Sequence, residues 1–297
     1  MYLVKFPLKP TQYHRVVIAL FLLMGLFSVN LDAGDFDASV APKSRFLLRI
    51  NPNIYFTSAH FLDNRKPANL DTVTGLLSFE MPIHIQYGLT GALSIGAIIP
   101  PIWTYQEIDP EIRYDPIHRF AIRDIWLTIQ HRWLAIPFVS SSSIRIKIPI
   151  SKKKDWEDGL RIGDGQVDIF PLYYIDYYSK RNYWYSELTV GYKFRLKQGD
   201  IKPLDEFHLK TQLGYELLPS LQVRFFLYAG IIDFRNGQFG DNVLEFYQKD
   251  GDLRTFGYGV SLWPRPSLRL EIATGGDWFG RNQYRGMRWL ISIAKII

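Results

Sequence analysis

Cysteine is absent from this 297-residue sequence, and long apolar runs are nearly absent. The first absence excludes a disulfide framework and a lipid-modified cysteine behind an export signal. Only residues 16–29 form an extended apolar run, and that run is shorter than the roughly 20 residues of a spanning helix. The sequence is therefore not that of a helical membrane protein, although hydrophobic residues make up 47% of it.

The single apolar run has the context of an export signal. Lys5, Lys9 and Arg15 precede it, and small and polar residues follow it up to Gly34, which predicts a secretory signal peptide with cleavage near Ala33. An N-terminal membrane anchor is the alternative. We expect a signal peptide over residues 1–33, a short periplasmic lead over 34–44 and the folded domain over 45–297.

Charge and histidine content argue against several classes of protein. The net charge of +6 comes from 35 basic and 29 acidic residues that are interspersed, with no basic block, so nucleic acid is a poor partner. The six histidines are scattered and no cysteine supports them, so we expect neither a metal site nor a cofactor.

Residues 77–100 show a strict period of two, which predicts a β-hairpin with one apolar face. Polar residues such as Ser78, Glu80, His84 and Gln86 occupy the opposite face. One such hairpin could pack on a second sheet in a soluble sandwich or face lipid in a membrane barrel. The apolar face comprises Leu77, Phe79, Met81, Ile83, Ile85 and Tyr87.

The remainder of the chain repeats this pattern. About twelve alternating segments follow one another, and their connections alternate between short turns and longer, more charged loops, as in outer-membrane barrels. Aromatic residues such as Trp133, Tyr177, Trp184 and Trp263 flank the short turns, where an interfacial girdle would lie. The pattern predicts an all-β, transmembrane, antiparallel up-and-down barrel in the outer membrane, with lipid and the barrel-assembly machinery as partners. We expect the longer loops over 58–71, 101–119, 152–164, 197–205, 231–252 and 275–283.

Alternation also predicts which side chains face the barrel interior. Arg145 and Lys147 alternate with Ile144, Ile146 and Ile148, and a lipid-facing Arg or Lys at mid-membrane would cost roughly 2 to 4 kcal/mol. These charges should therefore point inward, where they either pair and fill the interior or line a narrow pore for small polar or anionic solutes. The candidate pore-lining residues are Glu80, His84, Arg132, Arg145, Lys147, Asp168, Asp176, Glu187, Lys193, Lys210, Arg224, Glu271 and Arg288, with Arg49, Glu216 and Arg269 of the same parity.

Three segments resemble a known family. They are Tyr87-Gly88-Leu89-Thr90 leading to Leu93-Ser94-Ile95 and Pro100, then Ile148-Pro149 before a loop closing in Gly163-Asp164-Gly165-Gln166-Val167-Asp168-Ile169, and Val190-Gly191-Tyr192-Lys193-Phe194-Arg195. Together they resemble the outer-membrane proteins grouped as the phenol degradation meta-pathway family, over most of the mature chain. The resemblance implies a channel-like barrel, often associated with uptake of aromatic or other apolar compounds. Arg123-Asp124 replaces an expected Gly-Asp, so the substrates of that family are not transferred to this chain.

No catalytic motif is present in the sequence. Gly163-Asp164-Gly165 lacks a following Lys-Ser/Thr, which excludes a phosphate loop. His84 beside Glu80 fits a luminal polar network better than acid–base catalysis, and the His-x-Ser-Asn-Gly segment of the outer-membrane phospholipase is missing. We therefore expect no enzyme but a passive channel for small solutes, aromatic or other apolar compounds among them. A closed barrel with a structural or surface-interaction role is the alternative. Phe234, Phe239, Phe246 and Tyr247 in the longest loop are candidates for an apolar lid.

Overall fold

The computed structural model describes residues 40–69, 73–108, 117–135, 138–150, 166–179, 183–197, 202–218, 222–237, 250–265 and 267–297. The predicted signal peptide and its cleavage site near Ala33 lie outside these residues. Within the described ranges, no helix is long and apolar enough to cross a membrane.

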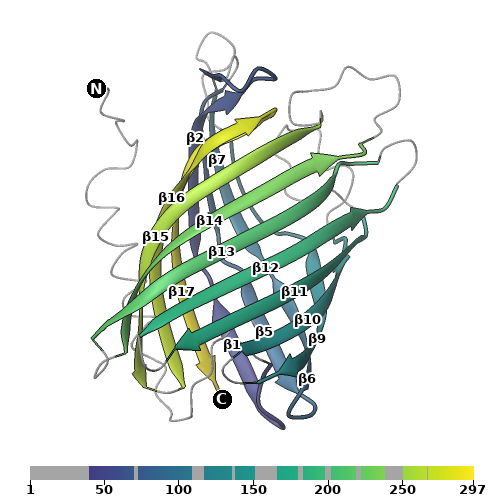
Figure 1. Ribbon diagram of the computed structural model, residues 1–297. Helices are drawn as coiled ribbons and strands as arrows, with labels where there is room; N and C mark the ends of the chain where they lie inside the picture. The colour runs from purple at the N-terminus through teal and green to yellow at the C-terminus, as the bar shows by residue number, and fades with distance from the viewer. Residues whose placement is uncertain are drawn as a thin grey trace.

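The described chain is built from β-strands that belong to one antiparallel sheet (Figure 1). The strands are β1 (Phe46–Ile50), β2 (Asn53–Phe61), β3 (Pro67–Asn69), β4 (Val73–Glu80), β5 (Ile83–Gly88), β6 (Leu93–Ile99), β7 (Pro101–Ile108), β8 (Ile117–Ile122), β9 (Ile125–Leu134), β10 (Phe138–Ile148), β11 (Asp168–Ser179), β12 (Trp184–Arg195), β13 (Asp205–Leu218), β14 (Val223–Arg235), β15 (Gly251–Arg265), β16 (Leu268–Arg281) and β17 (Gln283–Ile296).

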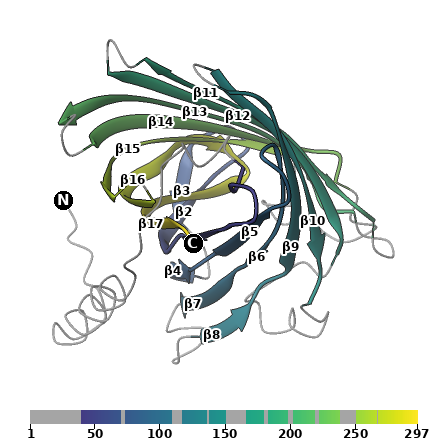
Figure 2. The same cartoon turned by 90° about the horizontal axis from the view of Figure 1, so that it is seen from below.

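The sheet closes on itself into a twelve-stranded barrel, which confirms the predicted fold class. Four barrel strands are interrupted and are described as pairs: β1 with β2, β4 with β5, β6 with β7, and β8 with β9. Strands β10 to β17 follow as single elements, each paired with the next. β1 pairs with both β17 and β5, and the ring continues through β6 and β9 to β10. Figure 2 shows the strands around their common interior.

The four interruptions lie side by side and form a line across the barrel wall. Pro52, Pro82 and Pro100 mark three of them, and the pair Arg123 and Asp124 marks the fourth. Proline has no backbone N–H and so cannot complete a ladder. Its carbonyl can still accept, and Asn51 N donates to Pro82 O at 3.0 Å while Arg123 N donates to Pro100 O at 2.9 Å. Backbone hydrogen bonding is thus maintained across the line although the strands break there.

Polarity is inverted relative to a soluble protein, with apolar side chains outside and polar ones inside. Ile129, Ile144 and Ile272 are more than half exposed on the outer face, whereas their neighbours Gln130, Ser143 and Ala273 are buried. Apolar groups gain nothing from water, so an apolar outer band around a closed sheet is the arrangement that lipid stabilises.

The strand ends separate into two sets, as the sequence predicts. The short connection 89–92 lies at one end, where β1 begins and the chain terminates, and β9 and β15 also end there (Figure 1). β10 and β14 end, and β11 and β15 begin, at the other end, on either side of the longer stretches between them. Ala41, in the predicted polar lead over 34–44, is buried against Leu47, Ala294 and Ile296 at the short-turn end.

Four of the expected loops are wrong in whole or in part, because strand pairing extends through residues that favour turns. Residues 101–119 contain β7 and the first residues of β8, and residues 275–283 belong to β16 and β17 apart from Asn282. Residues 58–71 include the end of β2 and all of β3. In the predicted loop 231–252, strand β14 continues to Arg235, so Phe234 is a strand residue paired with Glu206 and Gly251 rather than part of a loop lid. Phe239, Phe246 and Tyr247 lie outside the described residues.

Candidate luminal site

A cavity of about 310 Å³ lies inside the barrel beside the line of strand interruptions. Its lining comes from six adjacent barrel strands, from β4–β5 across to β12. Five cationic side chains and three acidic ones line it, together with one histidine and two aromatic rings. These residues are Arg123, Arg145, Lys147, Lys193, Arg195, Glu80, Asp124, Asp168, His84, Trp126 and Phe170, with Pro82, Ile98 and Pro100 completing the wall.

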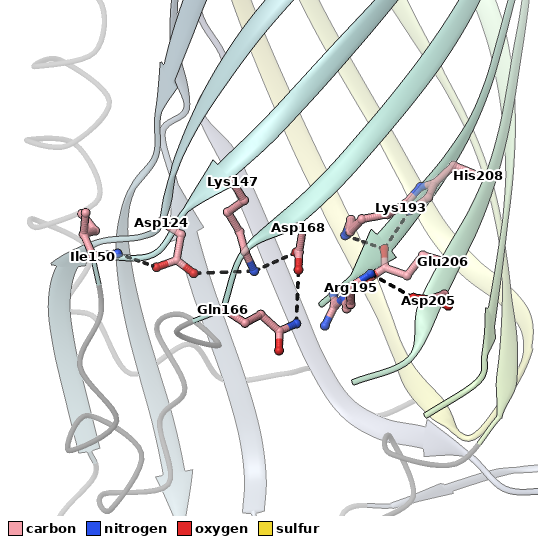
Figure 3. A network of polar contacts seen from close by, with 10 residues as sticks. All are labelled: Asp124, Lys147, Ile150, Gln166, Asp168, Lys193, Arg195, Asp205, Glu206 and His208. Atoms are coloured by element: carbon pink, nitrogen blue, oxygen red, sulfur yellow. Dashed lines mark hydrogen bonds and ion pairs between the residues drawn. The ribbon is translucent and has the colours of Figure 1, made fainter. Parts of the chain in front are cut away.

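Lys147 forms the centre of one ion network in the wall (Figure 3). Its Nζ lies 2.7 Å from Asp168 Oδ2 and 3.7 Å from Asp124 Oδ2, and all three side chains are at most 5% exposed. Ile150 N donates to Asp124 at 3.1 Å and Gln166 Nε2 donates to Asp168 at 3.2 Å. One buried lysine between two carboxylates is a structural unit, because removing its charge would leave the carboxylates buried together.

Glu206 of β13 forms the centre of a second network (Figure 3). Its Oε2 lies 2.6 Å from Lys193 Nζ and 2.7 Å from His208 Nε2, and its Oε1 pairs with Arg195. Asp205 accepts from Arg195 N at 2.9 Å. Two cations of the cavity wall are therefore held by a buried carboxylate from the next strand.

Arg145 differs from the other cations of the cavity. Its Nη2 donates to the Tyr174 hydroxyl at 2.8 Å. Among the residues that the structure describes, no carboxylate lies within ion-pair distance of it. It stands opposite Phe170 in the β10–β11 ladder, so a cation and an aromatic ring face the cavity together.

The two aromatic rings of the wall are positioned by their neighbours. Trp126 and Phe170 have ring centroids 6.3 Å apart, and Lys193 Nζ lies 5.7 Å from the Phe170 centroid. Phe170 lies directly over Gly191, where a Cβ atom would come within 2.7 Å of Phe170 Cε2. The absence of a side chain at Gly191 therefore makes room for the Phe170 ring and for Leu172.

The predicted pore-lining residues are distributed over several places. Six of them line the cavity: Glu80, His84, Arg145, Lys147, Asp168 and Lys193. Asp176, Glu187 and Arg224 are buried away from it, whereas Lys210 is exposed. Glu271 pairs with Arg269 at 2.5 Å, Arg288 pairs with Asp277 at 3.1 Å, and Arg132 donates to the Gly91 carbonyl at 2.6 Å.

Sequence reasoning missed part of the site. Arg195 and Glu206 have the inward parity of Lys193 and His208, so continuing the alternation by one residue pair would have found both. Asp124 could not be found in this way, because it lies at a strand interruption where parity is lost. Alternation gives no signal that the rings of Trp126 and Phe170 line a cavity.

The interior toward the short-turn end is occupied by side chains. Gln86 donates to Ser94 at 2.7 Å and to Gln130 at 3.0 Å, and Gln130 donates to Ser141 at 3.0 Å. On the opposite wall, the guanidinium of Arg224 lies 4.2 Å from the Trp263 ring centroid. These side chains occupy the part of the barrel interior between the cavity and the short-turn end.

The fold and the site together define a twelve-stranded antiparallel β-barrel with an apolar outer surface and a charged internal cavity. Comparison with solved structures agrees with this class. The barrel is similar to the COG4313 outer membrane channel from Pseudomonas putida F1, with a TM-score of 0.73 and 12% identity over 90% of this chain and 100% of that one. It is also similar to the NanC porin, with a TM-score of 0.50 and 8% identity over 84% of this chain and 98% of that one. No family model and no curated protein matches the sequence.

Proposed function

We propose that the protein is an outer-membrane β-barrel that acts as a passive channel for small solutes. The observation that carries the proposal is the cavity of about 310 Å³ inside a barrel whose outer surface is apolar. A protein that only anchors itself in lipid gains no stability from an internal cavity, because empty space forfeits packing. The solved barrels of similar fold include an outer membrane channel and a porin, which supports the same reading.

The proposal has further parts that follow from the sequence. Export by a signal peptide, insertion by the barrel-assembly machinery and residence in outer-membrane lipid belong to it. So do membership in the phenol degradation meta-pathway family and passage of aromatic or other apolar solutes, which the sequence resemblance implies. The proposal includes no catalytic step: His84 and Glu80 line the cavity, where Asn51 contacts His84 at 3.4 Å and Glu80 pairs with Arg123 at 3.2 Å.

Conductance of the purified mature protein in planar bilayers tests the proposal. We expect discrete current steps, and we expect Arg145→Glu to change their amplitude or ion selectivity because this side chain projects into the cavity. Lys147 is a poor choice for this experiment, since its charge is held between two buried carboxylates. Arg254→Glu, on the outer side of β15, serves as the matched control.

A closed barrel with a structural or surface-interaction role is the second candidate. It is favoured by the filled interior at the short-turn end, where Arg224, Trp263 and the buried Ala41 lie. Electrical silence of protein that is shown to be folded and inserted would support this candidate and overturn the channel.

A further inference from the structure

We propose that the cavity binds small organic carboxylates, with the carboxylate at Arg145 and a flat apolar body against Trp126 and Phe170. The inference deepens the proposed function and rests on it for one consequence only, that the bound anion lies on a transport route. Binding itself requires only the cavity and its lining.

The charge balance of the wall favours an anion. Each of the three acidic residues of the lining already has a cationic partner: Glu80 has Arg123, while Asp124 and Asp168 share Lys147. Lys193 and Arg195 are held by Glu206, which lies behind them. Only Arg145 carries its charge into the cavity with no carboxylate partner among the described residues. Asp124 and Asp168 share one lysine, whereas Lys193 and Arg195 share one glutamate, so the five cations of the lining exceed these four carboxylates by one positive charge over the wall as a whole.

Arg145 also has the donor geometry for a carboxylate. One nitrogen is occupied by the Tyr174 hydroxyl, which is neutral and fixes the position of the guanidinium without neutralising it. Its Nε is buried, as are the Nε atoms of Arg195 and Arg288, so a bound carboxylate would be held by the Nη nitrogens. A carboxylate can accept from two guanidinium nitrogens in parallel, which is the strongest such pairing that proteins use.

The aromatic rings determine the body of the ligand. Phe170 is the cross-strand partner of Arg145 on β11. Trp126 on β9 is the cross-strand partner of Lys147, the next inward-facing residue after Arg145 on β10. Aromatic rings stack on flat apolar groups and gain about 0.5 to 1.5 kcal/mol beyond area burial. A ligand such as benzoate would satisfy both parts of the wall, whereas acetate would satisfy only the cationic part.

The cavity volume agrees with a ligand of this size. About 310 Å³ is at the lower end of the range of small-molecule pockets, roughly 300 to 1,000 Å³. The site would exclude large solutes and bind one small ring with its carboxylate.

Calorimetry on the purified, folded barrel in detergent micelles tests binding directly, with four probes of matched shape or charge. We expect benzoate to bind, acetate to bind more weakly, and benzyl alcohol and benzyltrimethylammonium not to bind measurably. Arg145→Gln should weaken benzoate binding by roughly tenfold or more, as expected for loss of a hydrogen bond to a charged group. Arg254→Gln removes the same charge from the outer surface and should bind benzoate like the wild type.

Two further measurements keep the experiment decisive. If Arg145→Gln does not fold, Arg145→Lys and Phe170→Leu replace it: the first should keep the preference for anions with weaker binding, and the second should reduce benzoate binding to the level of acetate. Equal binding of benzyltrimethylammonium and benzoate, or unchanged benzoate binding in these variants, would overturn the carboxylate site.

Bilayer recordings separate the site from the channel. Benzoate that reduces the current in proportion to its binding supports both. Benzoate binding to a barrel that conducts no current supports the site and overturns the channel. Current that benzoate leaves unchanged, in a barrel that does not bind it, overturns the site and leaves the channel standing.

Discussion

Replacing Glu206 by glutamine should be one of the most destabilising single changes in the barrel wall. The side chain is 7% exposed and pairs with Lys193 at 2.6 Å, with Arg195 and with His208. Glutamine keeps the shape of glutamate but removes the charge that compensates two cations. Removing one partner of a buried ion pair costs about 3 to 5 kcal/mol, because the other charge stays buried without compensation. We expect a loss in this range.

The measurement is reversible urea unfolding of the barrel in lipid vesicles, followed by tryptophan fluorescence. Asp233→Asn is the matched control. Asp233 forms an ion pair with Arg235 at 3.0 Å, and the side chains are 32% exposed for Asp233 and 68% exposed for Arg235. Exposed pairs contribute about 0.2 to 1 kcal/mol. The two variants thus remove the same chemical group from a buried and an exposed environment.

A double variant identifies the cause of the loss. If uncompensated charge is responsible, Lys193→Met combined with Glu206→Gln should be less destabilising than the sum of the two single variants. The reasoning is refuted if Glu206→Gln costs no more than Asp233→Asn, or if the two changes add without coupling.

Three other predictions concern the wall and its outer surface. Ile146→Lys places a charge on the lipid face and should destabilise the barrel by roughly 2 to 4 kcal/mol in vesicle unfolding, whereas an equal loss in Ile146→Ala would contradict this. Gly257→Ala would put a Cβ atom 2.4 Å from the Tyr228 ring, so the free energy of unfolding in urea should fall by about 1 to 3 kcal/mol. Adding Tyr228→Phe should not restore it, because the ring itself remains. Asp277→Asn removes the carboxylate that lies 3.1 Å from the Arg288 guanidinium, so the folded barrel should unfold at a lower temperature than the wild type. The loss of the folded band on unboiled gels after heating measures this temperature, and an unchanged temperature would contradict the prediction.

The sequence was sufficient to predict the barrel because its strongest signal is local. In the segment from Ile144 to Ile148 every second side chain is apolar, and the structure places Ile144, Ile146 and Ile148 on the exposed outer face with Lys147 buried between Asp124 and Asp168. A period of two needs no tertiary information, so direction and strand type follow from the chain alone.

Strand ends could not be predicted in the same way. Glycine and proline near residues 275–283 and 101–119 favour turns by local propensity, but residues 101–108, 117–119, 275–281 and 283 belong to strands. Gly275 is required in its strand because the Tyr228 hydroxyl would lie 2.1 Å from a Cβ atom there, so it makes room for a ring from β14, two strands away in the sheet. Long-range packing of this kind overrides propensity and leaves no local signal.

The candidate site depends on the same features that made it hard to predict. Pro82 and Pro100 lie where their strands are interrupted because they lack an N–H group, yet their carbonyls accept from the neighbouring barrel strands, so the strands break there without losing these hydrogen bonds. The four interruptions fall in adjacent strands of the barrel. The cavity lies beside them and is bounded by both prolines and by Asp124 at the next break. We therefore infer that the interior space results from the line of interruptions, and that the charges select what enters it.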